Sequence, residues 1–288
     1  MALKDIRPFD HAVLPVEDLS LARARHEALG FTVAPDARHP FGTENACVYF
    51  DDDTYLEPLA VAQREDCERT ASKGNQFTRR DQTYRFRNGD NGFSAIAFKT
   101  DHADADHKAF QKQGLSGGRK LIFGRTFKTR DGEKLRATFK LVFASDLRAP
   151  DFFAFAVQRL QTLPSDKGAL VKHANGVTGI AEIIMTEDNP SDFQYFLQDF
   201  TGQRETEAHS FGMEMQLPNV RLNVMTPEAM RVTFGVQSKR KGRGLRLEGI
   251  VFERDGGALP ASARRVGQFV VADPAPGQGA FYAFTDHA

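Results

Sequence analysis

The 288-residue chain has no tryptophan and only two cysteines, Cys47 and Cys67. Two cysteines this far apart build neither a disulfide framework nor a Cys-x-x-Cys metal site, so we expect a cytoplasmic protein. The net charge is zero, because 38 Lys and Arg residues balance 38 Asp and Glu residues. Without an excess of either sign, the chain as a whole has no electrostatic preference for nucleic acid, membranes or acidic partners.

Long hydrophobic runs are also absent. The first ten residues, MALKDIRPFD, carry charges where an export signal needs an apolar stretch, so we expect no signal peptide. The apolar run FFAFAV at 152–157 is far too short to cross a membrane. With 41% hydrophobic and 26% charged residues, the composition is that of a globular protein, and the length allows two domains.

The N-terminal stretch 9–33 predicts a strand followed by a helix. Residues alternate between two faces of the strand, and His11 lies on one of them. Asp18 is a suitable N-cap for the helix, and Gly30 is a suitable stop. Further strands are expected at FTVA (31–34), ACVYF (46–50) and TYLEPLAV (54–61). The unit is therefore β-α-β-β-β.

This unit recurs along the chain. From Asp18 to Asp101 is 83 residues and from Asp101 to Asp188 is 87, and each Asp follows a similar strand. Such regular spacing indicates duplicated modules. A fourth copy at 245–284 is expected to be degenerate, because its crossover is short and rich in Gly and Pro. Since residues 161–176 separate two pairs of modules, we expect domains at 1–165, with the pocket, and at 173–288.

The chain resembles the vicinal oxygen chelate (VOC) superfamily, and more closely its glyoxalase-like proteins. The stretches that carry the resemblance are DHAVLPVEDL, HPFGTENACVYF, YLEPLAV, HANGVTGIAEIIMTED and APGQGAFYAF. The resemblance implies an α+β fold in which repeated β-α-β-β-β modules pair into curled sheets around concave pockets. It also implies metal ligands on the first and fourth strands of a module, at His11 and Glu57.

The predicted metal site is incomplete. An imidazole and a carboxylate form half of a ligand set for a divalent ion. The matching positions in the other modules offer no second histidine or carboxylate: they are Ser94 and Ala181 for His11, and Ala154, Asn223 and Ala283 for Glu57. A third ligand would need a loop residue such as His39. The expected cofactor is a weakly held Zn, Mn, Fe or Ni ion, or none.

Each candidate residue has more than one interpretation. His11 is a core histidine bonded to Glu57, a metal ligand, or a metal-free catalytic base. The stretch RHPFGTEN at 38–45 either joins two strands or contacts a substrate. Cys47 is expected to be a buried, inert thiol. We expect Glu57 to be catalytic, as the group that transfers a proton. The residues expected to bind the substrate are His39, Thr43, Asn45 and Tyr55.

The leading hypothesis is a VOC enzyme, a lyase, isomerase or dioxygenase, that acts on a small oxygenated molecule. One alternative is a metal-free protein that binds or sequesters a small molecule, as bleomycin-resistance proteins do. Another is a structural or regulatory module that retains only the fold. The expected partner is a small-molecule ligand, and the chain could form a homodimer. We expect no membrane partner. We also expect no nucleic acid, since the basic stretch SKRKGRGLR (238–246) lacks aromatic residues.

Overall fold

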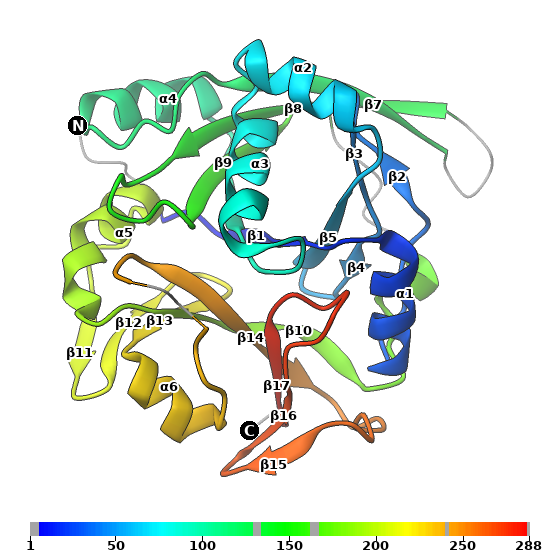
Figure 1. Cartoon of the computed structure of the whole chain (residues 1–288), viewed down its shortest axis with the longest axis vertical. Coiled ribbons are helices and arrows are strands. Elements are labelled where there is room, and N and C mark those ends of the chain that lie inside the picture. The colour runs from blue at the N-terminus through cyan, green and yellow to red at the C-terminus, as the bar shows by residue number, and fades with distance from the viewer. Residues whose placement is uncertain (1–5, 129–133, 162–166, 240–241, 287–288) are drawn as a thin grey trace.

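The structure, a computed structural model, describes residues 6–128, 134–161, 167–239 and 242–286. These residues form two mixed β-sheets, one from each half of the chain, shown in the upper and lower parts of Figure 1. Among the described residues, no helix is both long and apolar enough to span a bilayer. The α+β class expected from the sequence is confirmed.

The first sheet has the strand order β2-β3-β5-β1-β6-β9-β8-β7, and β4 also pairs with β5. Its two central strands are antiparallel, and each has a parallel neighbour, β5 beside β1 and β9 beside β6. The bounds are β1 (Phe9–Pro15), β2 (Ala37–Arg38), β3 (Thr43–Asn45), β4 (Val48–Tyr49), β5 (Tyr55–Val61), β6 (Ala95–Lys99), β7 (Leu121–Lys128), β8 (Lys134–Ala144) and β9 (Phe153–Arg159).

The second sheet repeats this plan in the order β11-β12-β13-β10-β14-β17-β16-β15. Its central strands β10 and β14 are antiparallel, with β13 and β17 as their parallel neighbours. The bounds are β10 (Val177–Thr186), β11 (Glu207–His209), β12 (Gly212–Gln216), β13 (Arg221–Met225), β14 (Arg246–Arg254), β15 (Arg264–Val266), β16 (Phe269–Ala272) and β17 (Phe281–Asp286). Each sheet is thus a pair of modules joined through their first strands.

The helices follow the predicted modules only in part. Asp18 caps α1 by accepting a hydrogen bond from the backbone N–H of Leu21, as expected. Asp101 and Asp188 do not cap their helices, because the cap positions fall one residue later. Helices α2, α3 and α6 were not predicted. The bounds are α1 (Leu19–Ala28), α2 (Arg64–Ser72), α3 (Gln76–Asn88), α4 (Ala103–Lys112), α5 (Gln194–Thr201) and α6 (Pro227–Phe234), with single 3₁₀ turns η1 (Gly168–Val171) and η2 (Pro190–Phe193).

The strand expected at 31–34 does not form. Its backbone groups bond outside a ladder: the N–H of Thr32 donates to the ring of His173, and that of Ala34 donates to the carbonyl of Cys47. The neighbouring Phe31 packs on Phe252, with ring centroids 5.3 Å apart. Contacts with Cys47 and with the second half of the chain therefore replace strand pairing here.

The main core lies between the two sheets and takes residues from both. A separate cluster covers the opposite face of the first sheet, where Val13, Leu59 and Phe155 meet Phe77 of α3. In Figure 1, α3 lies inside the curl of the first sheet. The expected domain boundary includes residues 162–166, which lie outside the described residues, and the division into two domains remains a prediction.

Candidate functional site

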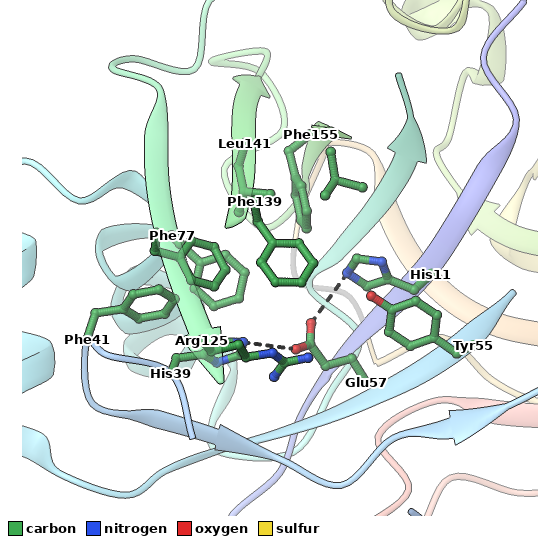
Figure 2. Close-up of a pocket in the computed structure, with 12 residues that line it drawn as sticks. His11, His39, Phe41, Tyr55, Glu57, Phe77, Arg125, Phe139, Leu141 and Phe155 are labelled. Carbon is green, nitrogen blue, oxygen red and sulfur yellow. Dashed lines mark ion pairs between the residues drawn. The ribbon is translucent and has the colours of Figure 1, made fainter. Parts of the chain in front are cut away.

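A small cavity opens on the concave face of the first sheet (Figure 2). It encloses about 40 Å³ of free space, enough for roughly three water molecules at ~10–15 Å³ each. Strands β1, β5, β7, β8 and β9, helix α3 and the stretch before β3 contribute its walls. The lining residues are His11, His39, Phe41, Tyr55, Glu57, Phe77, Phe123, Arg125, Phe139, Leu141, Phe155 and Val157.

His11 is held from both sides. Its Nδ1 donates to a carboxylate oxygen of Asp10 at 2.6 Å, and its ring stacks on Tyr55 with centroids 4.4 Å apart. Asp10 is fully buried and also pairs with Arg159 of β9, at 2.7 and 3.0 Å. A register shift between Phe9 and His11 interrupts the pairing with β6, and such bulges re-aim side chains.

Mutual contact favours the charged forms of Asp10 and His11 in spite of burial. Burial alone would raise the pKa of Asp10, but the charges of Arg159 and His11 outweigh it and lower that pKa. Burial likewise opposes the charged form of His11, yet its hydrogen bonds to Asp10 and Glu57 raise the pKa above the ordinary value. The two effects have the same origin, because each partner stabilises the charge of the other.

Glu57 is the carboxylate of the cavity. It is 5% exposed, and its Oε1 accepts a hydrogen bond from Nδ2 of Asn45 at 2.5 Å. The Nε2 atom of His11 lies 3.4 Å from one carboxylate oxygen, and that of His39 lies 3.6 Å from the other (Figure 2). Burial raises the pKa of Glu57, but bonding to His11 and the charges of His11 and His39 lower it to about 2. The carboxylate is therefore ionised at neutral pH.

The stretch before β5 divides into residues that line the cavity and residues that support it. His39 lines it, with its ring stacked on Phe41 at 4.9 Å. Thr43 is not among the lining residues, and its hydroxyl instead forms a hydrogen bond with Nδ1 of His39 at 2.9 Å. Asn45 is buried on β3 and holds Glu57. Of the four residues expected to bind a substrate, only His39 and Tyr55 are at the cavity wall.

The environment of His39 favours its neutral form. The side chain is almost fully buried, and this burial is the main reason why its pKa falls to about 4. The positive charges of Arg125 and His11 lower the pKa further, while Glu57 acts in the opposite direction. Near pH 7 the cavity thus holds a neutral imidazole beside an ionised carboxylate.

The residues that the second module contributes to the cavity wall were not predicted from the sequence. Phe123 and Arg125 of β7 lie on one face of their strand, and the guanidinium of Arg125 is 5.6 Å from the ring of Phe139 on β8. The alternation in LIFGRTFK was a usable signal, because it places an arginine on the face that carries phenylalanines. Nothing local in the sequence indicated which cavity that face would enter.

Three of the module equivalences need correction. Ala154 faces the core between the sheets, and it is Phe155 that lines the cavity. In the same module the counterpart of His11 is Ala95 and not Ser94, because the antiparallel pairing of β1 with β6 sets His11 opposite Ala97 and Val13 opposite Ala95. In the third module Ile184 pairs with Asn223 as Val13 pairs with Glu57, so the counterpart of His11 is Glu182 and not Ala181. A register shift on β10 between Ile180 and Glu182 explains the one-residue error.

The donors at the cavity suit a divalent ion in type but not in number. Ligands of one ion at about 2.0–2.2 Å lie roughly 3 Å from each other, close to the separation of His11 and Glu57. Asp10 on Nδ1 is the outer contact that metal-binding histidines commonly have. Within the described ranges, no group of three or more His, Cys, Asp or Glu is arranged to hold a metal. These residues would hold an ion weakly.

Residues 9–201 match the family described as glyoxalase-like domain, whereas no curated protein matches the chain. Among solved structures, a hypothetical protein from Staphylococcus aureus is similar over 98% of this chain and 100% of its own, with a TM-score of 0.70 and 14% identity. A mutant of 4-hydroxymandelate synthase from Streptomyces coelicolor is similar over 98% and 92%, with a TM-score of 0.56 and 13% identity. The Mn(II)-bound glyoxalase from Novosphingobium aromaticivorans is similar over 99% and 83%, with a TM-score of 0.52 and 10% identity. At such low identity these likenesses show the fold alone.

Proposed function

The chain belongs to the glyoxalase-like domain family, and we propose that it is an enzyme that acts on a small oxygenated molecule in the cavity of the first sheet. The observation that carries this proposal is the ionised carboxylate of Glu57, buried among aromatic rings and faced by two imidazoles. A buried charge is costly to maintain, and perturbed groups of this kind concentrate at functional sites.

In this proposal Glu57 takes a proton from a carbon next to a carbonyl group. The contacts with His11 and Asn45 make the resting carboxylate a weak base, with a pKa of about 2. A substrate that enters between His11 and Glu57 separates the two, and burial then raises the pKa of Glu57 toward useful base strength. His39 is neutral near pH 7, and its Nε2 atom lies 3.6 Å from the same carboxylate.

His11 and Glu57 are also the residues that would hold a divalent ion. Such an ion would act as a Lewis acid on a substrate oxygen. Asp10 would keep the ring of His11 in place, because its carboxylate fixes Nδ1 as the donor and directs Nε2 toward Glu57. Tyr55, stacked on the same ring, restricts its rotation.

A second candidate function is binding without chemistry. Eight of the twelve described side chains that line the cavity are apolar or aromatic. A site of this composition can retain a small molecule through apolar contact and a few polar groups. Sequestration of a small toxic molecule would need no proton transfer by Glu57.

Deuterium exchange separates the two functions without knowledge of the full reaction. Hydroxyacetone, dihydroxyacetone, pyruvate and methylglyoxal are incubated with the protein in D₂O, and loss of the C–H signal is followed by NMR. The enzyme hypothesis predicts exchange of at least one compound, slowed about 100-fold or more by Glu57→Gln. Glu44→Gln is the matched control, because Glu44 lies on the neighbouring β3 and pairs with Arg38 outside the cavity. Equal rates in wild type and Glu57→Gln would refute the assigned role.

A further inference from the structure

Arg125 gives the cavity a positively charged wall that the proposed proton transfer does not itself require. The side chain comes from β7 and lines the cavity, with its guanidinium over the ring of Phe139 at 5.6 Å. Figure 2 shows it extending into the space beside His39 and Glu57. The positive charge of Arg125 acts on the groups of this cavity, since it contributes to the lowered pKa of His39. A guanidinium presents N–H donors in a planar fork whose geometry matches the two oxygens of a carboxylate.

Phenylalanine rings form most of the remaining wall. Phe41 lies 5.5 Å from Phe77 and 5.2 Å from Phe123, and Phe123 stacks on Phe139 at 5.3 Å. Aromatic faces and edges of this kind favour a flat or branched apolar group over a polar one. Since the enclosed space is only about 40 Å³, the enclosed part of a ligand must be small.

We propose that the cavity takes a small monocarboxylate whose apolar body is a short alkyl group of one or two carbon atoms. Its carboxylate is bound by Arg125, and its body lies among Phe41, Phe77 and Phe123. The inference rests on the proposed use of this cavity as the binding site, and it adds the chemical class of the ligand. Planar two-point pairing between guanidinium and carboxylate supplies the orientation that a single lysine would not.

Propionate and propionamide provide the probes, because they have nearly the same shape, are small enough for the cavity and differ in charge. Titration calorimetry should show propionate binding at least about tenfold more tightly than propionamide. Arg125→Gln should weaken propionate about tenfold and leave propionamide unchanged, while Arg125→Lys should recover only part of the loss. Arg136→Gln is the matched control, because Arg136 is exposed on β8 and lies over Gly124, on the other face of the hairpin.

Three results would overturn the proposal: equal affinity for the two probes, no binding of either, or propionate affinity unchanged in both Arg125 variants. Circular dichroism of each variant verifies that the fold is retained, and Arg125→Lys keeps the test valid should Arg125→Gln unfold. Failure of the proposed enzyme function is a separate result. If Glu57→Gln exchanges deuterium at the wild-type rate while propionate still requires Arg125, the ligand class stands and the catalytic role does not.

Discussion

His26 joins the two halves of the chain and makes stability depend on pH. On α1, its Nδ1 donates to the carbonyl of Ala22 at 2.8 Å, and its Nε2 accepts from the hydroxyl of Tyr282 on β17 at 2.9 Å. The residue is 0% exposed. Burial is the main cause that lowers the pKa of His26 from 6.5 to about 4, and Arg25 adds to it while the bond to Ala22 opposes it.

The direction of the pH effect follows from this shift. Because the pKa is lower in the folded protein, the unfolded chain binds more protons below pH 6.5. The contribution of His26 to stability is complete above pH 6.5 and is lost as the pH falls toward 4. A shift of this size corresponds to about 3 kcal/mol in total, of which about 2 kcal/mol is lost at pH 5.

Urea unfolding at pH 7.5 and pH 5.0 tests the size of this effect. Far-UV circular dichroism is the suitable signal, since the chain has no tryptophan. The unfolding free energy of the wild type should fall by about 2 kcal/mol more than that of His26→Gln between the two pH values. His102→Gln, which alters an exposed histidine, should behave as wild type. The same loss in wild type and His26→Gln would refute the reasoning, whatever the stability of the variant at pH 7.5.

Three further predictions concern the cavity and its supports. Asn45→Ala should lower the unfolding free energy by roughly 1–3 kcal/mol, because it removes a donor from buried Glu57; an unchanged melting temperature would contradict this. Arg159→Leu should cost about 2 kcal/mol or more, measured by urea unfolding at pH 7.5, because buried Asp10 loses its arginine partner and keeps only His11. Co²⁺ should bind weakly in calorimetry and not at all to His11→Ala, whereas stoichiometric metal retained after EDTA dialysis would reveal a third ligand.

The sequence was informative where one residue pattern fixes one geometry. Strict alternation in residues 9–15 and 55–61 places His11 and Glu57 on one face of their strands, and the two strands pair in parallel. The pairing brings both side chains to the same cavity. The repeat in the sequence likewise predicted the paired modules of each sheet.

Positions that depend on distant contacts were predicted less well. Asn45 and His39 were expected on a loop between two strands, where side chains contribute little to stability, yet both are buried, and Gly42 between them packs closely against the start of α2. The φ of Gly42 is 98°, and a side chain there would meet the backbone of Gln63 and Cys67. Their substitution should therefore affect stability as well as binding, which the loop interpretation did not anticipate.

The two sheets fill their corresponding faces differently. On the second sheet, Met230 and Phe234 of α6 pack against Phe281 and Ile184. On the first sheet, Phe77 of α3 joins a similar apolar cluster, but a cavity remains beside it that Glu57 and Arg125 also line. We therefore place the proposed site on the first sheet, because apolar walls and charged side chains meet there in one enclosed space.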